Sequence, residues 1–219
     1  MDPFLTRPDD LPAEFPVFPL AGALLLPGGR LPLNIFEPRY LAMVEDALAQ
    51  GRMFGMALPD TAFPRVAGRS TIYRVVCLGR IASFAETEDG RYLITLRGLI
   101  RCRVLEELPD SPRGYRRVRA DHTPYLADLA EAPEEMGDRG ALLAALRPYF
   151  QARRMEADWP AIERMATPIL VTTLCMLCPF SDAEKQALLE APDPAARMAM
   201  LISLLRMDSA GPALGSLPS

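Results

Sequence analysis

FPVFPLAGALLLPGGRLPLNIFEPRYLAMV, residues 15–44, is the stretch that decides the fold of this chain. Proline or glycine interrupts its apolar runs before any of them reaches helical length, and a helical pattern begins only afterwards. The three runs span Val17 to Leu20, Leu24 to Leu26 and Leu31 to Phe36. The stretch predicts a small curled β-structure followed by a helix, with Phe36 as a core anchor between them and Arg30 exposed.

The helix after this β-structure has a recognisable start and end. Pro38 is tolerated in a first helical turn, where its missing N–H has no partner to lose, and Gly51 is typical of a helix C-terminus. Between them Leu41, Val44 and Leu48 recur at helical spacing. One side of the helix is therefore predicted to face the core.

A series of strand patterns follows the helix. Residues 53–59 form a short apolar run, and residues 71–84 and 91–105 form two long strand patterns. Asp89-Gly90 between them supplies the positive-φ residue that hairpin turns need. A further strand fits residues 114–120. We therefore expect a five- to seven-stranded, mainly antiparallel β-lobe over residues 10–127.

Beyond the β-lobe the apolar period changes from two to 3.6. Residues 128–137 are acidic and lack an apolar face, which predicts a linker. Residues 138–207 predict an α-helical bundle, in which Ser181 and Glu184 form a capping box and Asp193-Pro194 begins the last helix. Residues 208–219 are expected to be a flexible tail. The predicted fold class is α+β.

Composition excludes several kinds of function. The chain has 219 residues, a formal net charge of −4 and 23 arginines beside one lysine. A net acidic domain is a poor starting point for general nucleic-acid binding, because neutralised phosphates supply most of that affinity. The N-terminal sequence lacks a secretory pattern, and the longest nearly unbroken apolar stretch, residues 168–180, is too short to span a membrane. The prediction is a cytoplasmic protein without membrane association.

Four cysteines give no disulfide framework and no metal site. Cys175 and Cys178 form a C-x-x-C pair, but neither a thioredoxin-like strand nor a second ligand pair accompanies it. They are predicted to be buried helical thiols. We expect neither metal nor cofactor.

Three segments resemble the LON substrate-binding domain, the amino-terminal domain of the Lon ATP-dependent proteases. They are LLPGGRLPLNIFEPRY at 25–40, GLIRCRVLEEL at 98–108 and CPFSDAEKQALLEAPDPAARMAMLISLL at 178–205, and the last is similar to the helical end of free-standing bacterial LON-domain proteins. The resemblance covers residues 15–207. It implies a PUA-like β-barrel, a helical lobe, and recognition of polypeptides without cleavage.

The residues themselves also argue against catalysis. His122 is the single histidine, so no multi-histidine metal site can form and a catalytic triad has one candidate base. No phosphate-binding loop of the ATPase type is present. Ser181 and Lys185 are the one close serine–lysine pair, but capping accounts for Ser181 and an exposed helical position is expected for Lys185. The chain is not expected to be an enzyme.

The resemblance implies that the chain binds unfolded or partly folded polypeptides as an accessory or adaptor in protein quality control, with a protease or chaperone machine as partner. Within the opening segments, Glu37 can interact with the helix start and Arg39 can pair across to the strands, or both can present a peptide-binding edge. Methionine supplies adaptable apolar contacts. The candidate peptide-binding residues are Arg30, Glu37, Arg39, Tyr40, Met43, Met53 and Met56.

An RNA-binding module is the alternative. The densest basic run contains one aromatic residue and comprises Arg113, Tyr115, Arg116, Arg117 and Arg119. In a strand, Arg117 and Arg119 share a face with Tyr115, which is one way for a barrel to meet RNA. The competing interpretation is a solvated strand whose charges discourage edge pairing. The sequence leaves the client and the oligomeric state open.

Overall fold

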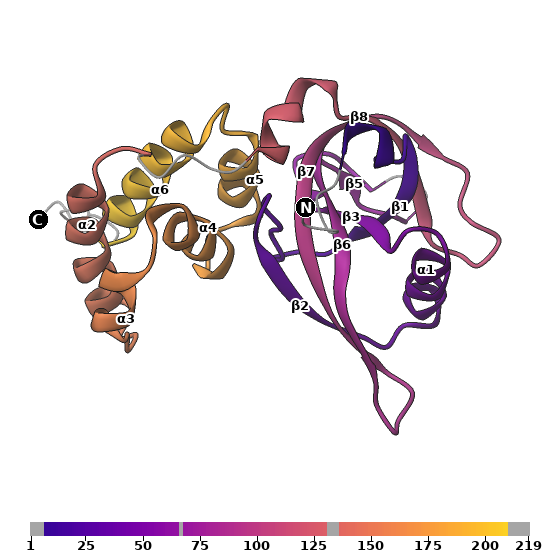
Figure 1. The fold of residues 1–219 in the computed structure, drawn as a ribbon, viewed down its shortest axis with the longest axis horizontal. Helices are drawn as coiled ribbons and strands as arrows, with labels where there is room; N and C mark the ends of the chain where they lie inside the picture. Colours follow the sequence, from indigo (N-terminus) through magenta and orange to yellow (C-terminus); the bar gives the residue numbers. More distant parts are fainter. Residues whose placement is uncertain (1–6, 66–67, 131–135, 210–219) are drawn as a thin grey trace, which may run out of the picture. The chain divides into compact units, whose positions relative to one another are not determined.

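The structure is a computed structural model, and it describes residues 7–65, 68–130 and 136–209. The chain forms two compact units (Figure 1). The first comprises Met1–Glu131 together with Met176–Glu190, and the second comprises Ala132–Cys175 together with Ala191–Ser219.

The first unit contains the strands, two short 3-10 helices and two α-helices. The strands are β1 (Glu14–Pro19), β2 (Arg30–Ile35), β3 (Met53–Ala57), β4 (Pro59–Asp60), β5 (Thr71–Ile72), β6 (Val75–Glu86), β7 (Tyr92–Leu108) and β8 (Arg116–Asp121). The short 3-10 helices η1 (Pro8–Asp10) and η2 (Thr123–Leu129), and the α-helices α1 (Pro38–Ala49) and α5 (Asp182–Glu190), complete this unit.

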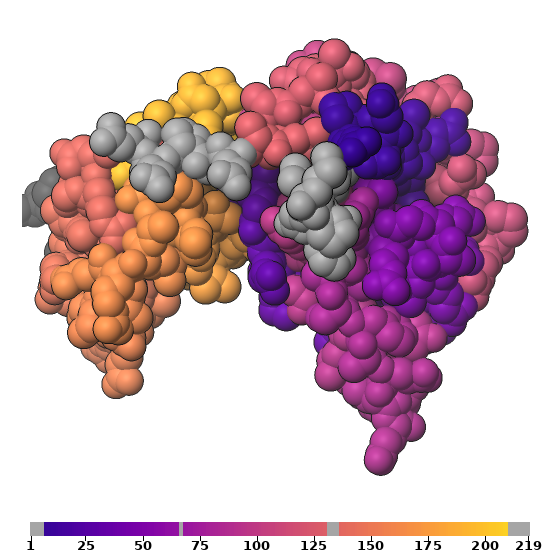
Figure 2. Space-filling view, viewed as in Figure 1, coloured from indigo at the N-terminus to yellow at the C-terminus, as the bar shows by residue number. Residues whose placement is uncertain are grey.

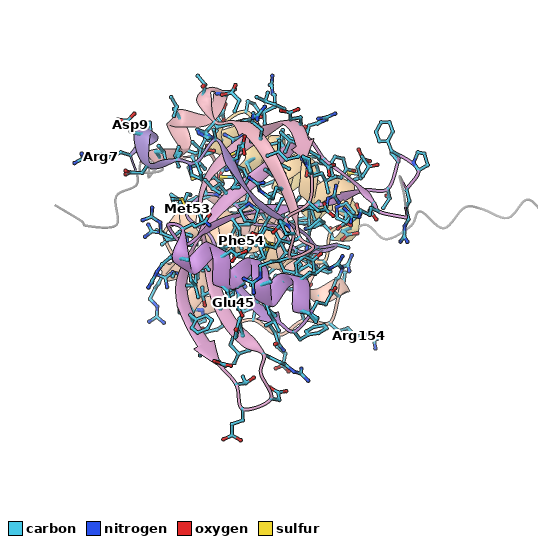
Figure 3. The ribbon with its side chains drawn as sticks, turned by 90° about the vertical axis from the view of Figure 1, so that its right-hand side faces the viewer. Arg7, Asp9, Glu45, Met53, Phe54 and Arg154 are labelled. Carbon is cyan, nitrogen blue, oxygen red and sulfur yellow. The ribbon has the colours of Figure 1, made fainter. Side chains whose placement is uncertain are left out.

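Six of these strands form one sheet that closes on itself. The order is β2-β7-β6-β3-β1-β8, and β8 also pairs with β7, so five strands make a ring and β2 lies outside it on β7. Every pairing in this sheet is antiparallel except that of β1 with β3. Met53 and Phe54 of β3, labelled in Figure 3, are both buried. The mainly antiparallel pairing agrees with the prediction, and the main sheet has six strands, but β4 and β5 bring the unit to eight strands, one more than the predicted maximum.

The second apolar run of the opening stretch crosses the sheet and is buried. Leu24, Leu25 and Leu26 each expose about 1% of their surface or less. The backbone then lies against β7, because Gly98 donates to the Gly29 carbonyl at 2.9 Å and accepts from the Gly28 N–H at 3.0 Å. A Cβ at position 98 would stand 2.1 Å from the Leu26 carbonyl oxygen, so only glycine permits this approach.

Strands β6 and β7 form a long hairpin that projects beyond the rest of the sheet (Figures 1 and 2). Gly90 in its turn has a φ of +76°, as predicted for the Asp89-Gly90 pair. Along β7 the side chains alternate: Ile94 and Leu96 are buried, whereas Leu93 is 46% exposed. The hairpin therefore has one face toward the core and one toward solvent.

Phe36 corrects one prediction. Its side chain is 61% exposed, and the guanidinium of Arg91 lies 5.9 Å from its ring centre. Leu33 and Ile35 of β2 are the buried positions, so period-two alternation directs the next side chain away from the core. Phe36 is thus not a core anchor, whereas Arg30 is exposed as predicted.

Helix α5 belongs with the strands, although the sequence predicted that it would join the helical lobe. Lys185 and Gln186 are buried, and both donate to backbone carbonyls of the first unit. Lys185 Nζ lies 2.6 Å from the Gly22 oxygen, and Gln186 Nε2 lies 3.0 Å from the Val75 oxygen. These contacts attach Met176–Glu190 to the sheet unit and overturn the prediction that Lys185 is exposed.

The predicted linker also begins later than expected. Asp128 lies in η2, and its carboxylate forms a buried ion pair with Arg101 of β7 at 2.8 Å. Arg101 also stacks on Tyr125, with 4.8 Å between the guanidinium and the ring centre. Burial opposes the charge of Arg101, but the bonds to Asp128 outweigh it and raise the pKa of the guanidinium. Residues 131–135 of the predicted linker lie outside the described residues.

The second unit is helical. It contains α2 (Arg139–Ala152), α3 (Trp159–Arg164), α6 (Pro194–Ser209) and all but the last two residues of α4 (Thr167–Leu177). Arg139 joins three of these helices, since it donates to Thr167 Oγ1 at 3.0 Å and to the carbonyls of Ile162 and Glu163 at 3.0 and 2.9 Å. The last helix begins as predicted, with Asp193 accepting from the Ala196 N–H. It extends to Ser209, two residues into the predicted tail, and residues 210–219 lie outside the described residues.

Candidate functional site

The predicted peptide-binding residues do not form one surface. Met43, Met53 and Met56 are buried in the first unit, with at most 8% of each exposed, and cannot offer contacts to a ligand. They fill the interior next to the strands and α1, as flexible thioethers often do. Of the other candidates, Arg30 is exposed on β2 and three residues cluster at the start of α1.

The start of α1 is held by an exposed ion pair. Glu37 accepts from Arg39 at 2.8 Å, so the expectation that Arg39 pairs across to the strands is wrong. Glu37 precedes the helix without capping it through its side chain. Tyr40 is buried between Phe18 at 4.2 Å and the Arg39 guanidinium at 4.6 Å, and burial raises the pKa of its hydroxyl. This cluster is explained by packing.

A hollow lies on the outward face of β2, β7 and β6. We call it the strand hollow; it has a volume of about 480 Å³ and is lined by Pro32, Leu33, Asn34, Ser83, Phe84, Ala85, Leu93, Ile94 and Thr95. The strand register explains it, because directly opposed residues share a face. Pro32, Thr95 and Ser83 form one row across the three strands, and Asn34, Leu93 and Ala85 form the next.

The chemistry of the strand hollow suits a mixed, extended ligand. Leu93 is 46% exposed on the outward face, where Asn34, Ser83 and Thr95 add small polar groups. Phe84 borders the hollow and is 42% exposed, but its register partner is the buried Ile94, which places its side chain on the other face. Phe36 follows β2 and is 61% exposed. Large apolar side chains gathered at one exposed place mark interaction surfaces more often than scattered ones do.

Within the described sheets, β2 has β7 as its one partner and forms the edge next to the hollow. Proline within a sheet is confined to edge positions, and Pro32 takes one N–H donor away from this edge. The face of the sheet, rather than its edge, is therefore the better place for contact.

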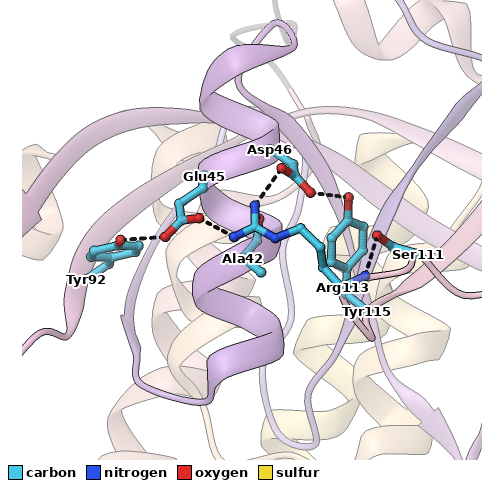
Figure 4. A network of polar contacts seen from close by, with 7 residues as sticks. All are labelled: Ala42, Glu45, Asp46, Tyr92, Ser111, Arg113 and Tyr115. Carbon is cyan, nitrogen blue, oxygen red and sulfur yellow. Dashed lines mark hydrogen bonds and ion pairs between the residues drawn. The ribbon is translucent and has the colours of Figure 1, made fainter.

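The basic run at 113–119 is held in ion pairs and does not present its aromatic residue. Tyr115 is 7% exposed, and its hydroxyl donates to Asp46 of α1 at 2.7 Å. Arg113 pairs with the same Asp46 and with Glu45, which also accepts from Tyr92 (Figure 4). The bonds from Arg113 lower the pKa of Glu45, and burial raises the pKa of Tyr115. This network fastens α1 to the strands.

The three arginines of β8 are also paired. Arg116 binds Glu107 at 2.6 Å, Arg117 binds Glu14 at 3.2 Å, and Arg119 binds both Glu14 and Glu106. The predicted requirement for an RNA surface, arginines on one exposed face with Tyr115, is therefore not met.

A second hollow of about 240 Å³ lies beside Tyr40 and Tyr115 and has four arginines in its wall. Three of them already hold carboxylates: Arg39 pairs with Glu37, Arg69 with Asp110 and Arg116 with Glu107. The positive charge of this hollow is largely neutralised within the protein.

Ser181 and Lys185 do not contact each other as a nucleophile and its base would. Ser181 exchanges hydrogen bonds with Glu184 in the predicted capping box, at 2.8 and 3.3 Å, and Lys185 Nζ is bound to the Gly22 carbonyl. Burial lowers the pKa of Lys185 and raises that of the Cys102 thiol to about 12. Cys175 and Cys178 are both buried, as predicted, but Cys178 follows the end of α4 at Leu177, so only Cys175 is helical.

Metal-ligand side chains do not gather in the described part of the chain: no group of three or more could hold a metal ion. His122 Nδ1 lies 4.0 Å from Cys102 Sγ, where its ring is half-buried. Within the same residues, no helix combines the length and apolar composition needed to cross a membrane.

Comparison with known proteins identifies the family. The model of the ATP-dependent protease La (LON) substrate-binding domain matches residues 14–207, and the chain belongs to this family. Among related sequences, the Lon protease of Anaeromyxobacter dehalogenans is 26% identical over 212 residues, which are 93% of this chain and 24% of that protein. The Lon protease of Salinispora arenicola is 31% identical over 197 residues, 89% of this chain and 24% of that protein. The chain thus spans about a quarter of these relatives.

Solved structures show the same fold. A Lon N-terminal domain protein from Xanthomonas campestris is 25% identical, with a TM-score of 0.59 over 87% of this chain and 97% of that one. The N-terminal domain of Lon protease from the Mycobacterium avium complex is 21% identical, with a TM-score of 0.57 over 88% and 97%. The resemblance inferred from the three sequence segments is confirmed.

Sequence reasoning missed the strand hollow. Of the residues that line it, none was among the predicted site residues, because each is unremarkable in its own segment. The one available signal was the alternation along residues 92–97, which indicates that Leu93 points away from the core.

Proposed function

We propose that the chain binds unfolded or partly folded polypeptide at the strand hollow, without cutting it. The carrying observation is the hollow itself, an open face of three strands on which Leu93 is exposed among small polar side chains. An extended polypeptide places alternate side chains toward such a face, so it can fill the hollow with apolar groups while its backbone meets the polar ones. The family's description as a substrate-binding domain supports this proposal.

The proposal extends to the place of the protein in the cell. A PUA-like barrel that holds a polypeptide serves as an accessory or adaptor when a protease or chaperone machine receives the bound segment. The engagement of Ser181 and Lys185 in structural hydrogen bonds supports binding without cleavage. The RNA-binding alternative has less support, because the β8 arginines already bind carboxylates and Tyr115 is buried.

Binding of labelled β-casein, a disordered protein, tests the proposal by fluorescence anisotropy. Leu93→Asp places a charge in the hollow and should weaken binding about tenfold, or ~1.4 kcal/mol. Leu105→Asp is the matched control, since Leu105 is a 55% exposed leucine on the same strand outside the hollow. Equal affinities of the two variants, or absence of binding by the unmodified protein, would contradict the proposal.

A further inference from the structure

Three arginines are neighbours in the strand register next to the strand hollow. The register pairs Arg97 of β7 with Arg30 of β2 on one side and with Arg80 of β6 on the other. Directly opposed residues share a face, so the three guanidinium groups form one line across the strands, which we call the arginine row. Arg30 and Arg97 are exposed, and Arg80 is half-buried.

The arginine row has no counter-charge of its own. Within the described parts of the chain, none of its three members forms an ion pair or a hydrogen bond through its side chain, and the Nε of Arg80 is a buried donor without a partner. Like charges directly opposite each other destabilise a sheet, and a buried donor without a partner adds to that cost. An anionic ligand would offset both.

The row and the strand hollow form one continuous surface. The next line of side chains along the strands is Pro32, Thr95 and Ser83, which belongs to the hollow. Arg97 and Leu93 are four residues apart on β7, which corresponds to ~13 Å in a strand. An extended polypeptide lying along β7 covers this distance in about four residues as well.

We infer that this surface prefers polypeptide segments in which acidic side chains lie about four residues from large apolar ones. The apolar side chains occupy the hollow near Leu93, and the carboxylates bind the arginine row, where guanidinium groups can accept them in bidentate geometry. The inference rests on the proposed function and adds the chemical class of the bound segment. A polypeptide is favoured over RNA because the surface is half apolar and the wall of the hollow has no aromatic residue besides Phe84.

Three synthetic 15-residue peptides provide the test. They share a Leu-Phe centre and differ at the fourth and sixth positions beyond it, which carry Asp and Glu, two Gln, or two Lys. The unmodified protein should bind the acidic peptide roughly tenfold more tightly than the lysine peptide at low salt, and the preference should fall at 0.5 M NaCl.

Two variants locate the effect. In Arg97→Gln, the preference for the acidic peptide over the glutamine peptide should fall to about twofold or less. The urea midpoint of this variant should not be lower than that of the unmodified protein. Arg103→Gln, an exposed arginine on β7 that lies opposite Asp121, should retain the preference of the unmodified protein. Urea midpoints of both variants show whether a change in binding comes from the missing guanidinium or from unfolding of the protein.

The outcomes distinguish the two proposals. Binding of all three peptides with equal affinity, or an unchanged preference in Arg97→Gln, would overturn this inference and leave the proposed function standing. Failure to bind any peptide would overturn both. A 12-residue oligouridylate that competes with the acidic peptide, and whose own binding is lost in Arg97→Gln, would show that the row takes phosphates of RNA instead.

Discussion

Arg97 and Arg119 each lie between two neighbouring strands and have one register partner on each. The partners of Arg119 are acidic, whereas those of Arg97 are basic. Arg119 on β8 lies between Glu14 of β1 and Glu106 of β7 and binds both. Arg97 on β7 lies between Arg30 of β2 and Arg80 of β6. The number of arginines in a segment therefore says little about anion binding. The charge of the residue opposite on the neighbouring strand decides whether a guanidinium already forms an ion pair within the protein.

The buried ion pair of Arg101 and Asp128 is the least exposed of these ion pairs, and breaking it should give the largest loss of stability. Asp128→Asn leaves the 5% exposed guanidinium without its counter-charge and should lower the free energy of unfolding by ~3–5 kcal/mol. Urea titration measures it. Asp110→Asn removes the partner of Arg69, whose side chain is 52% exposed, and should change stability by under ~1 kcal/mol. Similar losses in the two variants would show that burial does not separate these pairs.

Exchanging the charge at the two central positions tests the comparison directly. Arg97→Glu places a carboxylate between two arginines and should raise the urea midpoint, whereas Arg119→Glu places it between two glutamates and should lower it. Each shift should be smaller than that of Asp128→Asn because the sites are exposed to solvent. If both variants lose stability to the same extent, the charge of the opposite residue is not the deciding factor.

The loss of stability in acid should be the smallest effect, and it should come from the carboxylates that form ion pairs with arginines. Bonds from Arg113 lower the pKa of Glu45, and bonds from Arg69 lower the pKa of Asp110. A carboxyl with a lowered folded pKa stabilises the fold above its unfolded pKa, near 4, and this stability is lost as the pH falls through the folded value. Urea midpoints from pH 6 to pH 3 should therefore decline.

Two variants assign this acid response. Arg113→Gln and Arg69→Gln should each make the decline shallower, and 0.5 M NaCl should act in the same direction. An identical pH profile in the variants would attribute the acid response to other carboxylates.

Local patterns predicted the elements of the fold well. Alternation along β7, the Asp89-Gly90 turn and the capping box at Ser181 depend on neighbouring residues only, and the structure contains all three. Phe36 shows the limit of such patterns. Alternate residues of the apolar run at 31–36 face the core, but the run does not reveal which set does, and Phe36 belongs to the exposed set.

The errors that remained depend on contacts between distant segments. Lys185 and Asp128 are ordinary surface residues by sequence, and their burial follows from a backbone carbonyl at Gly22 and a guanidinium at Arg101. The arginine row is the same kind of feature, because the strand register brings Arg30 of β2 next to the distant β6–β7 hairpin. No local signal marks such sites.

The burial of Lys185 has a practical consequence. It is the one lysine of the chain, so it carries the one side-chain amine, and this amine is hydrogen-bonded and 5% exposed in α5. Acylating reagents attack the neutral, accessible amine, so Lys185 should react only when α5 separates from the sheet unit. The rate of acetylation at this residue, read by mass spectrometry, would report how often that helix opens, and the protein carries this reporter without any engineered label.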